Sequence, residues 1–113
     1  MLFRSLVGAP QTIEGFGPDV DVISRLEHFS VALSCDGVVR ETGRGSNVLG
    51  NPLAAMAYLL SVIATQPRAA AIVAGELVTT GTITAAYPIR AGETWSTVFD
   101  GIALPGLTVE FGD

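Results

Sequence analysis

The sequence predicts one α+β domain spanning residues 1–113, built mainly of antiparallel strands with one long buried helix. Three observations support this fold class. Several short stretches alternate apolar and polar residues between Asp-Gly, Ala-Gly or Pro-Gly turns, which is typical of antiparallel strands. One apolar segment, residues 52–65, is rich in helix-forming residues. The 113 residues contain no repeat, linker or low-complexity tract, so they fit a single domain.

The first third of the chain contains the pattern of a β-hairpin. We expect residues 2–17 to form a strand followed by a loop, whereas residues 16–27 fit neither a helix nor a strand clearly. From Phe29 to Cys35 the residues alternate with the period of two that a strand requires. Asp36 and Gly37 then favour a tight turn into a second strand, so this stretch predicts a hairpin.

A helix is predicted after the glycine-rich turn. Asn51 is a good helix cap and Pro52 is favoured at the first helical position, while Pro67 ends the helix before Gln66. Apolar residues occupy nearly every face of this segment, which predicts burial on several sides. One small domain offers too little core to cover such a helix, so we expect a partner surface.

The last third of the chain is rich in β-branched and aromatic residues. Turn residues divide it into four predicted strands, at Glu76–Thr80, Ala86–Ile89, Thr94–Asp100 and Leu107–Phe111.

Composition excludes several classes of function. Only 15% of the residues are charged, against about 25% in a typical domain, and 49% are hydrophobic, so some apolar surface should be left for an interface. The net charge is −5 and no basic run exists, so we expect no nucleic-acid partner. The chain has no lysine, which excludes a Schiff base or a lysine base from its own residues.

Targeting signals are not expected. Cys35 is the single cysteine, which predicts neither an internal disulfide nor a cysteine-based metal site and suits a cytoplasmic location. The first residues lack the apolar core and cleavage site of a signal peptide. The apolar segment Pro52–Ala64 is shorter than the roughly 20 residues of a membrane span, so we expect a soluble protein without a membrane partner.

The glycine-rich turn GRGSNVLG, residues 43–50, is interpreted as structural. Its third glycine comes too late for a dinucleotide-binding fingerprint, and no lysine follows as in a phosphate-binding P-loop. Arg44 is expected to be exposed to solvent rather than to bind a carboxylate. We therefore expect the turn to position the following helix.

Isolated polar residues offer weak catalytic candidates. His28 is the only histidine and has no nucleophile motif beside it, so a structural or exposed role is favoured. Asp19 and Asp21 alone provide too few ligands for a hard cation. The hydroxyl-rich stretch TTGTIT, Thr79 to Thr84, is either a substrate loop whose donors meet a carboxylate or an ordinary threonine-rich strand.

Four segments, in this order, resemble one family. They are GRGSNVLGNPLAAMAYL (43–59), AGELVTTGTIT (74–84), PIRAGETW (88–95) and GLTVEF (106–111). They resemble the C-terminal half of the 2-keto-4-pentenoate hydratases and 4-oxalocrotonate decarboxylases, members of the fumarylacetoacetate hydrolase superfamily. The similarity covers about Leu26 to Phe111.

The resemblance implies a partial fumarylacetoacetate hydrolase-like roll, a Mg²⁺ or Mn²⁺ cofactor, and small 2-keto or 2-hydroxy-dienoate acids as substrates for hydration or decarboxylation. The family's TG-S/A-x-T-G loop matches Thr80, Gly81, Thr82 and Thr84, which are the implied substrate contacts. Ala85 stands where a glycine is common, which stiffens the turn.

The family's metal-binding Glu-x-Glu pair, third acidic ligand and catalytic lysine lie in its N-terminal half. This chain has no Glu-x-Glu and no lysine, so no metal ligand or catalytic residue is assigned. Two hypotheses stay open. The chain is the C-terminal half of a hydratase or decarboxylase, acting as a homo-oligomer or with a complementary N-terminal half. Alternatively, it is a non-catalytic binding or subunit-pairing module.

Overall fold

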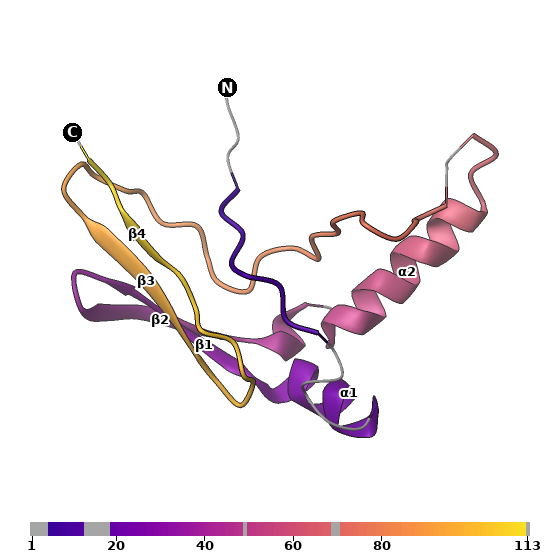
Figure 1. The fold of residues 1–113 in the computed structure, drawn as a ribbon, viewed down its shortest axis with the longest axis horizontal. Coiled ribbons are helices and arrows are strands. Elements are labelled where there is room, and N and C mark those ends of the chain that lie inside the picture. The colour runs from indigo at the N-terminus through magenta and orange to yellow at the C-terminus, as the bar shows by residue number, and fades with distance from the viewer. Residues whose placement is uncertain (1–4, 13–18, 49, 69–70, 113) are drawn as a thin grey trace.

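A computed structural model describes residues 5–12, 19–48, 50–68 and 71–112 and shows the α+β architecture that the sequence predicts (Figure 1). Four strands form one antiparallel sheet in the order β2-β1-β3-β4. The helical elements are α1 (Asp19–His28), the short 3₁₀ helix η2 (Gly45–Asn47) and α2 (Pro52–Ala64). The strands are β1 (Ser30–Cys35), β2 (Val38–Arg44), β3 (Thr94–Asp100) and β4 (Thr108–Glu110).

The predicted hairpin is confirmed as β1 and β2. Asp36 and Gly37 both have positive φ angles, 50° and 81°, as a tight two-residue turn requires. The pairing is interrupted once, because Leu33 pairs with Glu41 and Ser34 pairs with Val39. Arg40 is therefore the extra residue of a β-bulge in β2, a feature that redirects a side chain.

The last two predicted strands are confirmed, with β4 shorter than expected. β1 pairs along its whole length with residues 95–100 of β3, which places Cys35 opposite Trp95 although the two are far apart in the sequence. The pairing places Phe99 opposite Val31. A small core forms there from Phe29, Val31 and Ile102, against which Leu26, Ile83, Phe99 and Leu104 pack.

Two predicted strands, at residues 76–80 and 86–89, are wrong. The chain from residue 71 to 90 has no strand among its described residues. Its side chains have β propensity, but no strand in the described part of the chain is paired with it. The strand predicted near the start is also not seen over residues 5–12, and the remainder of that prediction lies outside the described residues.

The ambiguous stretch before the hairpin contains α1. Val22 and Phe29 are 5% exposed and Leu26 is half-buried. Val22 and Leu26, four residues apart, share one face of α1, and Phe29 directly follows the helix and belongs to the core. That apolar spacing is the signal that would have identified the helix.

The helix α2 begins and ends as predicted, but it is not buried. The Asn51 side chain accepts a hydrogen bond of 2.8 Å from the backbone N–H of Leu53, which confirms the cap. No residue of α2 is buried, and Tyr58 is 67% exposed. Figure 1 shows α2 projecting away from the sheet, and α2 contacts α1.

The stretch Gly45–Ala64 is long and apolar enough to cross a membrane by length and composition alone. The α-helix within it has 13 residues and is about 20 Å long, short of the hydrocarbon core of about 30 Å.

The molecule is open for its size. Its accessible surface is 8489 Å², whereas a compact protein of this mass exposes about 5,900 Å². Its radius of gyration is 16.0 Å, against about 13 Å for a compact chain of this length. The excess surface belongs largely to α2 and to the extended residues 71–90, whose side chains mostly lack cover.

Candidate functional site

The four predicted substrate contacts lie on one loop that is held against β2. The Asn47 side chain donates a hydrogen bond of 3.0 Å to the backbone carbonyl of Ile83, in the middle of the loop. Ile83 also packs against the core and lies directly on Gly43, where an added Cβ would come within 2.5 Å of its Cγ2. Glycine at position 43 therefore lets the loop approach the strand backbone.

Glu41 fixes the C-terminal end of the loop. Its carboxylate accepts hydrogen bonds of 3.2 and 3.3 Å from the Ala85 backbone N–H and one of 2.6 Å from the Tyr87 hydroxyl. The hydrogen bond to Glu41, with burial as a smaller cause, raises the pKa of Tyr87 above its usual range. The Tyr87 ring also packs against Trp95, with ring centroids 5.8 Å apart.

The anchored loop leaves hydroxyl groups available. Thr80 is half-buried, Thr82 is exposed, and Gly81 between them has a φ of 108°, which favours glycine. Thr84 differs, because its hydroxyl donates a hydrogen bond of 3.1 Å to the carbonyl of Ala85. The arrangement presents hydroxyl and backbone N–H donors that suit a carboxylate, and Thr84 chiefly stabilises the turn.

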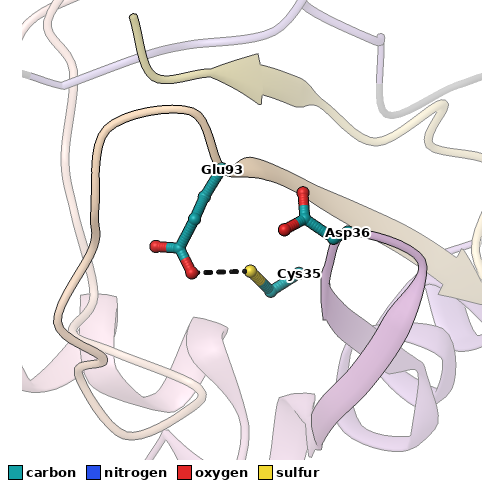
Figure 2. A group of neighbouring side chains, drawn as sticks. All are labelled: Cys35, Asp36 and Glu93. Carbon is teal, nitrogen blue, oxygen red and sulfur yellow. Dashed lines mark hydrogen bonds between the residues drawn. The ribbon is translucent and has the colours of Figure 1, made fainter. Parts of the chain in front are cut away.

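A second cluster, which the sequence reasoning missed, brings together Cys35, Asp36 and Glu93 (Figure 2). One potential ligand atom from each residue lies within 4.8 Å of the others. Cys35 ends β1 and Asp36 follows it in the turn, whereas Glu93 precedes β3, so the long-range β1–β3 pairing brings Glu93 to the other two. Cys35 and Glu93 are 58 residues apart, so the sequence alone gave no signal that they form a cluster.

The hydrogen bonds of this cluster explain it without a metal ion. The Cys35 thiol donates to Glu93 at 3.2 Å, the Thr94 N–H donates to Asp36 at 2.9 Å, and the Arg90 N–H donates to Glu93. Burial, reinforced by Glu93, raises the pKa of the Cys35 thiol, and the hydrogen bond from that thiol is the main cause that lowers the pKa of Glu93. The thiol thus stays protonated at neutral pH.

These residues do not fit the divalent cation that the family resemblance implies. Mg²⁺ and Mn²⁺ prefer oxygen ligands, whereas this cluster contains a protonated thiol and carboxylates already bonded to N–H groups. No other group of three potential ligands is found among the residues that the structure describes.

The remaining candidates have structural environments. His28 ends α1, is exposed, and its Nδ1 lies 2.9 Å from the carbonyl of Ser24. Arg44 is exposed, as predicted. At Gly45 an added Cβ would come within 1.8 Å of the Leu26 carbonyl, so the glycine-rich turn packs tightly on the end of α1. The side chains of Asp19 and Asp21 lie outside the described residues.

The chain is similar to known enzymes over part of their length. It is 35% identical over 77 residues to 4-oxalocrotonate decarboxylase from Pseudomonas sp. (strain CF600) and 36% identical over 84 residues to the enzyme of the same name from Pseudomonas putida. These matches cover 68% and 74% of this chain but only 28% and 30% of the relatives. No family model matches the chain.

Solved structures agree with the sequence comparison. The fold matches 4-oxalocrotonate decarboxylase from Pseudomonas putida G7 with a TM-score of 0.66 and 32% identity, covering 77% of this chain and 32% of that one. One of these structures is complexed with calcium and acetate, and another with magnesium and adipate. The resemblance seen in the sequence is confirmed, and with it the fold of the matched part.

Proposed function

We propose that this chain, a relative of the 4-oxalocrotonate decarboxylases over 28–30% of their length, supplies the substrate-facing loop of a lyase site. The substrates would be small 2-keto or 2-hydroxy-dienoate acids. The observation that supports this most directly is the loop from Thr80 to Thr84, which matches the family pattern and is held at Ile83 by Asn47 of η2 and at its C-terminal end by Glu41 of β2.

The loop would bind and orient the substrate. Acids of this class carry a carboxylate, and the hydroxyls of Thr80 and Thr82 with the neighbouring N–H groups can donate hydrogen bonds to it. Anchoring by Asn47 and Glu41 reduces the conformational entropy that the loop loses on binding. In this proposal the loop binds one end of the substrate, and the substrate bond that is broken in the reaction lies away from the loop.

Decarboxylation is favoured over hydration. Both curated relatives and both solved structures bear the name 4-oxalocrotonate decarboxylase. We propose that Mg²⁺ or Mn²⁺ is held by residues outside this chain, because its own three-residue cluster does not suit such an ion. A cytoplasmic location is part of this proposal and agrees with the unpaired, buried Cys35 thiol.

The rest of the site would come from a partner, either a complementary N-terminal half or another copy. The open shape supports such an arrangement, because α2 leaves apolar side chains in solvent. The same observation supports the second candidate, a subunit-pairing module without catalysis, which the missing lysine also favours.

A chimera tests the proposed role of the loop. In the Pseudomonas putida decarboxylase, the matched segment is replaced by this chain, and consumption of 4-oxalocrotonate is followed by ultraviolet absorbance. We expect activity, and we expect Thr82→Val to raise KM about fivefold or more because a hydrogen bond to a charged group is lost. Thr108→Val, on exposed β4, is the matched control and should leave KM unchanged.

A folded chimera without activity would support the pairing module. An active chimera in which Thr82→Val behaves like Thr108→Val would remove Thr82 from the substrate contacts. Loss of absorbance with 2-hydroxypenta-2,4-dienoate instead of 4-oxalocrotonate would identify hydration as the reaction.

A further inference from the structure

The loop from Thr80 to Thr84 is called the threonine loop below. A polar cleft, separate from this loop, lies beside the bulge of β2 and the start of β3. Its volume is about 320 Å³, which suits a small metabolite. The residues that line it are Arg40, Tyr87, Pro88, Arg90, Glu93 and Trp95. None of the residues from Thr80 to Thr84 lines this cleft.

Two arginines reach the cleft from different elements. Arg40 is the extra residue of the β2 bulge, which directs its side chain out of the regular alternation of the strand. Arg90 lies in the turn before β3, where its backbone N–H donates to the Glu93 carboxylate and its carbonyl accepts from the Glu93 N–H at 3.3 Å. This turn fixes the position of Arg90 at the rim.

The wall of the cleft contains a polar group without a partner. Trp95 is 9% exposed, and its indole N–H is buried with no hydrogen-bond acceptor among the described residues. The neighbouring Glu93 carboxylate already accepts hydrogen bonds from Cys35 and from the backbone of Arg90. The N–H itself is not exposed to the cleft, so Trp95 contributes the apolar surface of its ring to the wall.

We propose that this cleft binds a small organic carboxylate. Among the residues that line the cleft, two arginines face one carboxylate, Glu93, in a chain whose net charge is −5. Guanidinium groups bind carboxylates through paired N–H donors. Glu93 disfavours a doubly charged phosphate, whereas the rings of Pro88 and Trp95 offer apolar contact to a carbon chain.

This proposal does not depend on the proposed lyase function, because it involves other residues and is measured by binding alone. Trp95 is the only tryptophan, so its fluorescence reports directly on the cleft. The folded 113-residue chain is titrated with acetate, adipate and phosphate, each against sodium chloride of equal ionic strength. The midpoint of urea unfolding is measured in parallel.

We expect a saturable fluorescence change with adipate or acetate and a higher urea midpoint at saturation. Arg40→Gln and Arg90→Gln should each weaken binding about three- to fivefold, the range for partly exposed ion pairs. Arg68→Gln, an exposed arginine that does not line the cleft, should bind like the unaltered chain.

Three outcomes would overturn the proposal. The first is a change that sodium chloride reproduces. The second is equal affinity in the Arg40, Arg90 and Arg68 variants. The third is phosphate binding that is tighter than carboxylate binding.

Discussion

Two carboxylates, Glu41 and Glu93, organise the loops that carry both proposed sites. Glu41 holds the end of the threonine loop through Ala85 and Tyr87. Glu93 joins the turn before β3 to the buried Cys35 thiol. Glu41 lies 44 and 46 residues from Ala85 and Tyr87, and Glu93 lies 58 residues from Cys35, so these contacts depend on the assembled fold.

The pair Cys35 and Glu93 predicts a stability that falls at both ends of the pH range. The lowered pKa of Glu93 means that the folded state binds its proton less readily, so this contribution is lost as pH falls below about 4.3. The raised pKa of Cys35 means that the folded state keeps the thiol proton, so its contribution is lost as pH rises above about 8.5. Urea midpoints measured from pH 3 to pH 10 check both limits.

A variant of Glu93 tests the loss of stability at low pH. Glu93→Gln should flatten the acid side, while Glu110→Gln, exposed on β4, should leave it unchanged. A Glu93→Gln variant that keeps the full acid dependence would show that protonation of Glu93 does not cause the loss of stability at low pH.

At the scale of elements, the contact between β2 and the threonine loop depends on Gly43. Gly43→Ala should push the loop away, because its Cβ would lie 2.5 Å from Ile83 Cγ2 and 2.7 Å from the Ile83 carbonyl. We expect a loss of about 1–3 kcal/mol in the free energy of unfolding, as for other overpacked sites. Gly112→Ala is the control, because its added Cβ would meet nothing within 4 Å. Equal urea midpoints for the two variants would contradict the contact.

The sequence predicted those elements whose signals are local. The alternation from Phe29 to Cys35, the turn at Asp36 and the cap at Asn51 each act over a few residues, and all three are confirmed. The two wrong strands between residues 71 and 90 have suitable side chains, but a strand also needs a paired neighbour, which is a non-local condition.

The sites were predictable to different degrees. The threonine loop was found by its resemblance to a family motif, yet its anchoring by Glu41 and Asn47 depends on contacts 36 to 44 residues apart. The cleft lined by Arg40 and Arg90 gave no sequence signal. The two arginines are far apart in the sequence, and only a bulge in β2 and a turn before β3 bring them to the same cleft.

At the scale of the whole molecule, exposed apolar surface predicts association. The surface exceeds that of a compact protein by roughly 2,600 Å², and Tyr58 and Leu60 of α2 are 67% and 44% exposed. Leu60→Arg should therefore weaken binding to the remaining part of the Pseudomonas putida decarboxylase without lowering the urea midpoint of the chain. Sedimentation of the mixture measures this, and unchanged binding would exclude α2 from the interface.

The most direct test of the central claim, that this chain supplies only part of a lyase site, is the ultraviolet absorbance of 4-oxalocrotonate with Mn²⁺. The chain is assayed alone, the remaining part of the Pseudomonas putida decarboxylase alone, and the two mixed, each with and without EDTA. We predict loss of the substrate signal only in the mixture and its suppression by EDTA. Metal-dependent turnover by this chain alone would contradict the account, because its own residues would then form a complete site.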